Sequence, residues 1–206
     1  MGCDIHIRAE VKKGKNWQAV GPVFKSSWSS EEGKLISEPY SSRNYELFSF
    51  LAGVRNRFGI TPIAEPKGWP KDMSEELKKD LEDDWNSDGH SASWFTLKEL
   101  EDADWDTTVR HGGVVPADVY EYLKYVKEKP KAYSQGISGT NIVQLDQAEW
   151  DALPWQQKTN GTRYHVYMWW EDSMKELAEW FYTNTLPALR NLGEPDKVRI
   201  VFCFDN

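Results

Sequence analysis

The chain has 206 residues, of which 39% are hydrophobic and 28% charged, a composition typical of a soluble globular protein with one sizeable core. Its 33 acidic residues outnumber its 25 basic ones, and the resulting net charge of −8 argues against a general nucleic-acid binder or an anionic-membrane binder. No apolar run approaches the roughly 20 residues of a membrane span.

The N-terminal residues predict a β-hairpin. Residues 3–11 alternate, with Ile5 and Ile7 on one side of a strand and Asp4 and His6 on the other. A turn around Gly14 leads to a second strand at 17–20, and the Ser- and Gly-rich residues 26–42 are expected to be loop. The charged residues also interrupt any signal-peptide core, and two cysteines make no disulfide framework, so we expect a cytoplasmic protein.

Helical patterns fill the middle of the chain. Helices are expected from about 45 to 55, capped by Ser42 or Asn44, and from 74 to about 85. A turn at 88–90 precedes a Thr96-x-x-Glu99 capping box, which opens a short helix ending before 107. Pro116 is suited to the first turn of a further helix.

The last quarter of the chain predicts sheet again, in strands at 162–170 and 197–204. A long helix from about 172 to 192 is expected between them, with Pro187 as a kink or an early end. The fold class is therefore α+β: a mixed or antiparallel sheet of N- and C-terminal strands packed by helices. We expect one domain over 1–206, with a mainly helical and loop insertion at about 59–135.

Two Asp-x-His patterns provide the main candidate site. Asp4 and His6 share a strand face, and Asp88 and His90 lie in a turn-rich stretch that could aim both groups inward. If the terminal strands are adjacent, Arg199 joins the first pair and could hold phosphate. The alternative is a solvated sheet face carrying ordinary surface charges.

Further candidates surround these groups. They are Asn44 and Tyr45 at a helix N-terminus, which favours anions, together with Ser91, Trp94 and Asp205. Each has a structural alternative: Asp88 in an Asx-turn, Ser91 or Ser93 as a helix cap, Trp94 as a core anchor. Arg55 is expected to cap helix carbonyls. A divalent metal on Asp4, His6, Asp88 and His90 stays open, although no established ligand spacing is matched and no cofactor is required.

Several motifs resemble a family of small, mostly uncharacterised bacteriophage and prophage proteins. They are MGCDIH at 1–6, NYELF at 44–48, DGHSASW at 88–94 and FDN at 204–206, whereas residues 110–160 have no such counterpart. Lys67 and Trp69 stand where family members generally have Arg and Leu. The resemblance implies a phage accessory protein in the cytoplasm of an infected bacterium, where such proteins often counter host defence.

Three functions follow as expectations. The first is binding of a small nucleotide, a host immune signal that the protein would sequester. The second is a phosphodiesterase-type hydrolase acting on such a nucleotide at the same site, with His6 or His90 as general base and with or without a metal. The third is a protein–protein inhibitor of a host enzyme. General nucleic-acid binding and membrane binding are not expected, and a homo-oligomer stays open.

Overall fold

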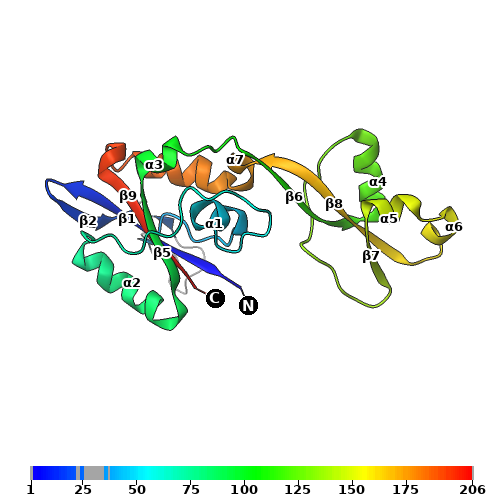
Figure 1. Cartoon of the computed structure of the whole chain (residues 1–206), viewed down its shortest axis with the longest axis horizontal. Coiled ribbons are helices and arrows are strands. Elements are labelled where there is room, and N and C mark those ends of the chain that lie inside the picture. Colours follow the sequence, from blue (N-terminus) through cyan, green and yellow to red (C-terminus); the bar gives the residue numbers. More distant parts are fainter. Residues whose placement is uncertain (1, 22–23, 26–34, 37, 206) are drawn as a thin grey trace. The chain divides into compact units, whose positions relative to one another are not determined.

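A computed structural model describes residues 2–21, 24–25, 35–36 and 38–205 of the chain (Figure 1). The chain divides into two compact units: unit 1 combines Met1–Thr107 with Ser173–Asn206, and unit 2 is Thr108–Asp172. The sequence predicts an insertion at about 59–135, whereas in the structure residues 59–107 belong to unit 1 and the separate unit contains a sheet of its own.

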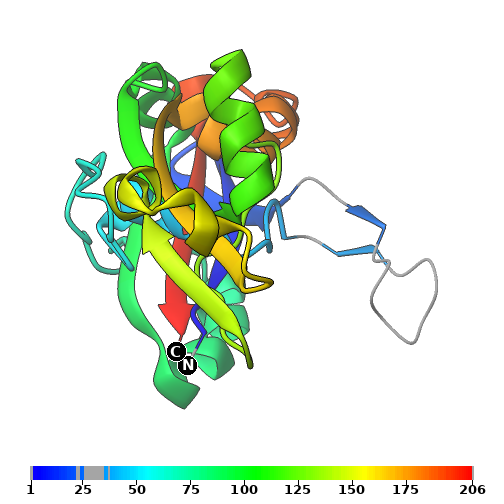
Figure 2. The same cartoon turned by 90° about the vertical axis from the view of Figure 1, so that its right-hand side faces the viewer.

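Unit 1 is built on a four-stranded antiparallel sheet with the order β2-β1-β9-β5. The strands are β1 (Asp4–Lys13), β2 (Asn16–Val20), β5 (His90–Thr96) and β9 (Val198–Asp205). The predicted hairpin is confirmed, and so is the sheet of terminal strands, since β1 pairs with β9 along its length. Both views show the N- and C-terminal ends of the chain together (Figures 1 and 2).

A second, two-stranded sheet pairs β3 (Phe24–Lys25) with β4 (Leu35–Ile36). The sequence predicts loop over 26–42. Residues 26–34 and 37 lie outside the described part of the chain, and Leu35–Ile36 is strand.

The register of the central strands separates a polar face from an apolar face. Asp4 lies opposite Asp205, His6 opposite Cys203 and Glu10 opposite Arg199, so these side chains share one face of the sheet. The other face carries Ile5, Ile7, Ile200, Phe202 and Phe204, all at most 3% exposed. Burial of each such side chain contributes roughly 1.5–3 kcal/mol, which makes this face the main core of unit 1.

Helices cover both faces of this sheet. On the apolar face, Phe48 of α1 (Tyr45–Ala52) packs edge-to-face on Phe204 with ring centroids 5.1 Å apart. On the polar face, Leu77 and Leu81 of α2 (Glu75–Asp88) join a buried cluster with Val201. The predicted capping box of Thr96 and Glu99 opens α3 (Leu97–Asp102), as expected.

The segment around the second Asp-x-His pattern differs from the predicted turn. Helix α2 runs to Asp88 and β5 begins at His90, so Gly89 alone links them. A bulge between His90 and Ser93, with Ser91 at φ +53°, accommodates this abrupt change of direction. Neither serine caps a helix: Ser93 is buried within the strand, and its Oγ accepts from the Lys67 N–H at 3.2 Å.

The predicted helix over 172–192 is confirmed in its extent, since residues 174–190 are helical apart from a turn at Ala178. It is divided into α7 (Met174–Leu177), a π-helical turn (Phe181–Thr185) and α8 (Leu186–Arg190). Pro187 lies in the first turn of α8, where its missing N–H costs least, and the wider π turn precedes it. A short 3-10 turn (Pro195–Lys197) then leads into β9.

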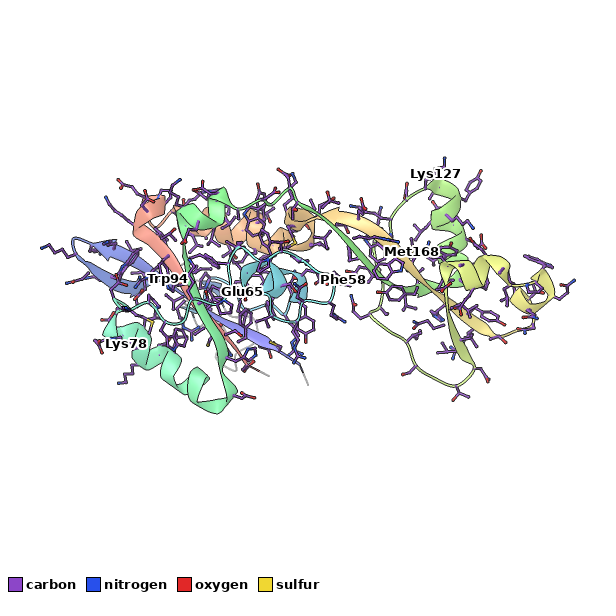
Figure 3. All side chains as sticks on the ribbon, viewed as in Figure 1. Phe58, Glu65, Lys78, Trp94, Lys127 and Met168 are labelled. Carbon is purple, nitrogen blue, oxygen red and sulfur yellow. The ribbon has the colours of Figure 1, made fainter. Side chains whose placement is uncertain are left out.

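Unit 2 has a three-stranded sheet with the order β6-β8-β7. The strands are β6 (Thr108–Pro116), β7 (Ile142–Asp146) and β8 (Arg163–Ser173), and β7 runs parallel to β8. The helices are α4 (Ala117–Val126), α5 (Gln147–Ala152) and α6 (Trp155–Lys158). Tyr120, Trp150, Val166, Met168 and Trp170 form its core, and Met168 is labelled on β8 in Figure 3.

Candidate functional site

The polar face of unit 1 brings three of the predicted residues together. The Asp205 carboxylate accepts from the Asp4 backbone N–H at 3.0 Å and pairs with His6 Nε2 at 3.2 Å. The His6 and Asp205 side chains are 23% and 29% exposed. This geometry orients an imidazole and places three of the candidate residues, Asp4, His6 and Asp205, side by side.

The Asp4 carboxylate forms an ion pair with an arginine. Arg43 holds both carboxylate oxygens through Nε at 2.8 Å and Nη2 at 2.5 Å. This hydrogen bonding and the positive charge lower the pKa of Asp4 below its ordinary value. Asp4 is therefore an ion-pair partner within the protein, and a ligand would have to displace Arg43 to reach it.

Asn44 and Tyr45 have structural roles. The Asn44 Oδ1 accepts from the Leu47 N–H at 2.9 Å, which caps α1, and its Nδ2 donates to the Leu177 carbonyl at 2.8 Å. The Tyr45 hydroxyl accepts from the Cys3 N–H at 3.3 Å. The helix terminus that was predicted to attract an anion is thus satisfied by its own cap.

Arg199 lies on the polar face as predicted, but it is 2% exposed and paired internally. Its Nε donates to Glu10 at 2.7 Å, its Nη1 donates to Asp72 at 2.8 Å, and Trp17 stacks 4.0 Å from the guanidinium. The hydrogen bond from Arg199 lowers the pKa of Asp72. The expectation of a phosphate-binding Arg199 is not met, because every face of the guanidinium is already used by the fold.

His90 and Ser91 lie on the other face of the sheet from His6. His90 pairs with Phe204 and stacks on its ring with centroids 6.0 Å apart, while its Nδ1 lies 2.9 Å from Ser91 Oγ. Its Nε2 is buried without a hydrogen-bond partner among the described residues. The two Asp-x-His patterns consequently reach the same end of the sheet on opposite faces and share no pocket.

The remaining predicted residues are dispersed. Asp88 is exposed at the end of α2. Trp94, labelled in Figure 3, is partly buried against Leu77 and Val201, with the Lys67 ammonium 4.5 Å from its ring, so its reading as a core anchor holds. Arg55 donates to the Gly2 carbonyl at 3.3 Å. It lines a hollow of about 600 Å³ with His90 and Ser91.

A larger pocket, which sequence reasoning missed, lies in unit 2. It has a volume of about 770 Å³, within the roughly 300–1,000 Å³ of small-molecule sites. It is formed by the start of α4, by α5 and α6, and by the start of β8. Its walls combine three kinds of group: the rings of Trp150, Trp155 and Tyr164, the cations Lys158 and Arg163, and the carboxylates Asp118 and Glu121.

The pocket presents one aromatic ring to solvent. Trp155 is 73% exposed, whereas Trp150 is 5% exposed and belongs to the core. Lys158 covers the Trp150 ring at 4.2 Å, and Glu121 accepts from the Trp150 indole N–H at 2.7 Å. Trp155 is therefore the wall residue with a face available for stacking on a flat ligand.

Positive groups lie beside that ring. Lys158 and Arg163 line the same pocket, and the Lys158 ammonium also lies 3.6 Å from the Glu121 carboxylate. The N-terminus of α4 begins at Pro116 without a side-chain cap. Uncapped backbone N–H groups and two cations favour an anionic group. His165 also lines the pocket, and its Nδ1 is buried without a partner among the described residues.

Comparisons with known proteins add no relative. No protein-family model, curated protein or solved structure matches the chain. Within the described residues, no helix is long and apolar enough to cross a membrane, and no group of three or more His, Cys, Asp or Glu side chains could hold a metal ion. Cys3 and Cys203 are both buried, and neither forms a disulfide within the described residues.

The sequence contained one signal for the missed pocket. Residues 150–165 interleave Trp150, Trp155 and Tyr164 with Lys158, Arg163 and His165, an aromatic and cationic mixture typical of sites for flat anionic ligands. The contribution of α4, some forty residues earlier, depends on tertiary packing and has no local signal.

Proposed function

We propose that this protein binds a small nucleotide in the pocket of unit 2. The observation that carries the proposal is the exposed Trp155 ring in one pocket with Lys158, Arg163 and the uncapped start of α4. A nucleobase would stack on Trp155, and a phosphate would lie between the two cations and the helix terminus. Asp118 would accept hydrogen bonds from ribose hydroxyls, because Glu121 is already bonded to Trp150 and Lys158.

The biological role that we propose is sequestration of a signalling nucleotide, because the terminal motifs resemble phage accessory proteins. A binding protein of this kind needs affinity for the ligand and no chemistry.

Isothermal titration with AMP, cyclic ADP-ribose isomers and cyclic dinucleotides tests the proposal. We expect at least one to bind, and Trp155→Ala to weaken that binding about 5- to 150-fold, the range for loss of one base–aromatic stack. Trp180→Ala is the matched control, because Trp180 is also exposed, at 59%, and lies in unit 1. Equal effects of the two substitutions, or no binding at millimolar ligand, would contradict the proposal.

The phosphate contact has its own test. Lys158→Ala should weaken binding, whereas Lys124→Ala should not, although Lys124 also contacts a ring, at 5.7 Å from Tyr120, and a carboxylate, that of Asp151. Both variants remove one cation from unit 2, so the difference between them reports the pocket rather than net charge.

Hydrolysis is the second candidate function, and the unpartnered Nδ1 of His165 favours it, since a general base needs a ring nitrogen that the protein does not use. Ligand recovered intact from heated complex supports sequestration, and recovered fragments support hydrolysis. In the second case, His165→Ala should abolish turnover while binding is retained.

A further inference from the structure

The sheet of unit 2 has a second face, opposite the one that α4 and α5 cover. Along β8, alternate residues bring Arg163, His165, Tyr167 and Trp169 to this face, because side chains alternate across a strand. The intervening residues Val166, Met168 and Trp170 form the core with Trp150 of α5. Arg163 and His165 also line the pocket, so the face continues directly from it.

Aromatic rings lie on this face in a fixed arrangement. Tyr167 and Trp169 contact each other with ring centroids 5.1 Å apart, and Trp169 is 43% exposed. The Arg110 guanidinium of β6 lies 5.4 Å from the Trp169 ring. Gly112 makes room for both rings, since a Cβ there would lie 2.7 Å from Tyr167 and 3.2 Å from Trp169.

The charge of unit 2 differs from that of the whole chain. Of the 25 basic and 33 acidic residues, 7 and 8 lie in unit 2, which leaves 18 and 25 in unit 1. The acidic excess therefore belongs almost entirely to unit 1. On the β8 face, Arg110 and Arg163 flank the rings, and the carboxylate of Glu171 follows only at the end of the row.

We propose that the β8 face binds a short single-stranded nucleic acid whose terminal nucleotide occupies the pocket. In the edge-to-face pair of Tyr167 and Trp169, whose ring planes lie at 62°, the exposed Trp169 ring would stack a base, while Arg163 and Arg110 would contact the phosphates on either side of it. Exposed Gln144, which pairs with His165 in the sheet, adds an amide for a base edge. The inference rests on the proposed function, because it extends the ligand of the same pocket.

Fluorescence anisotropy with labelled eight-nucleotide oligo-dT, oligo-U and oligo-A tests it on the full chain. We expect one of them to bind at least about tenfold more tightly than its mononucleotide. Trp169→Ala should weaken octamer binding about fivefold or more and leave mononucleotide binding unchanged, whereas Trp169→Phe should restore most of it. Trp180→Ala again serves as the control.

The salt dependence of binding tests the phosphate contacts. Two such contacts predict a slope of about −1.4 for log K against log salt concentration, and Arg110→Gln should reduce the magnitude of this slope by about 0.7.

Two outcomes overturn this inference alone: octamers that bind no tighter than mononucleotides, or equal binding of a duplex of the same sequence, since a duplex cannot stack its bases on the rings. In both cases mononucleotide binding that depends on Trp155 still supports the proposed function. Absence of mononucleotide and octamer binding would remove both proposals.

Discussion

At the scale of single residues, the buried polar side chains of unit 1 form hydrogen bonds and ion pairs with one another. Arg199 and Glu10 are 2% and 0% exposed and hydrogen-bond each other directly, with Asp72 and Trp17 completing the surroundings of the guanidinium. Glu10 also accepts from the Ser74 N–H at 2.8 Å, just before α2 begins. The pair therefore links β1, β9 and the start of α2.

Removal of either Arg199 or Glu10 should lower the stability of unit 1. Arg199→Met leaves the Glu10 carboxylate buried without its cation, and we expect a loss of about 3–5 kcal/mol in the free energy of opening of the unit 1 sheet. Native-state hydrogen exchange of the β9 amides measures it. The double variant Glu10→Leu with Arg199→Met should recover most of the loss. A change below about 1 kcal/mol in the single variant would contradict this account.

Asp4 predicts a pH dependence with a definite sign. The hydrogen bond from Arg43 lowers the pKa of Asp4 from 3.8, its value in the unfolded chain. The pair therefore stabilises the fold above that pH, and the contribution is lost as pH falls through the lower, folded-state pKa. Carboxyl carbon NMR should show Asp4 titrating below 3.8, and Arg43→Gln should raise its pKa towards that value. Lys98→Gln, which removes a cation bonded to Asp102, should leave Asp4 unchanged.

At the scale of elements, the strand pairing of unit 2 depends on one glycine. A Cβ at Gly112 would lie 2.6 Å from the Met168 carbonyl oxygen on β8, a backbone atom that cannot move without disturbing the sheet. Gly112→Ala should destabilise unit 2 by about 1–3 kcal/mol through overpacking. Gly136→Ala is the control, since a Cβ there meets nothing within 4 Å. Exchange rates of the β6 and β8 amides compare the two, and equal rates would disprove the close approach.

Local patterns in the sequence predict some of the elements of this protein, whereas β5, β6, β7, α5 and α6 were not predicted. The alternation of 3–11, the Thr96–Glu99 capping box and the apolar run of 198–204 each give the observed element, because periodicity and caps act over a few residues. The irregularity of the C-terminal helix was predicted as a kink or an early end at Pro187, and the π turn before it was not predicted because it has no local signature beyond that proline.

The candidate site was less predictable because it depends on pairings between distant residues. The bulge in β5 decides that His90 faces Phe204 rather than His6, and Arg199 meets Asp72 across 127 positions of sequence. Neither relation can be read from spacing. The shared face of Asp4, His6 and the last strand could be predicted, because both terminal strands alternate, whereas Arg43 as the partner of Asp4 could not.

At the scale of the whole molecule, each unit has its own core. Phe48, Phe202 and Phe204 lie at the centre of unit 1, and Trp150, Val166 and Met168 at that of unit 2. Unit 2 spans only 65 residues, Thr108–Asp172, and domains of about this size bury a smaller share of their surface than larger ones. Its stability should therefore be the lower of the two.

Hydrogen exchange in increasing denaturant should then show two cooperative groups of amides, with those of unit 2 released first. Trp150→Ala should accelerate exchange in unit 2 alone, and Phe48→Ala in unit 1 alone, because each ring lies in one core. A single free energy shared by all protected amides would show instead that the units unfold together.

The place of β9 between β1 and β5 also constrains how the polypeptide folds during synthesis. Asp4 pairs with Asp205 and His90 with Phe204, so β9 completes the sheet by pairing with segments made about 200 and 114 positions earlier. Such high contact order slows folding, and until β9 emerges the facing edges of β1 and β5 have no partner. All strands of unit 2 are made before β9, so unit 2 can fold while the sheet of unit 1 is still incomplete. The nascent chain would depend on chaperones most during that interval.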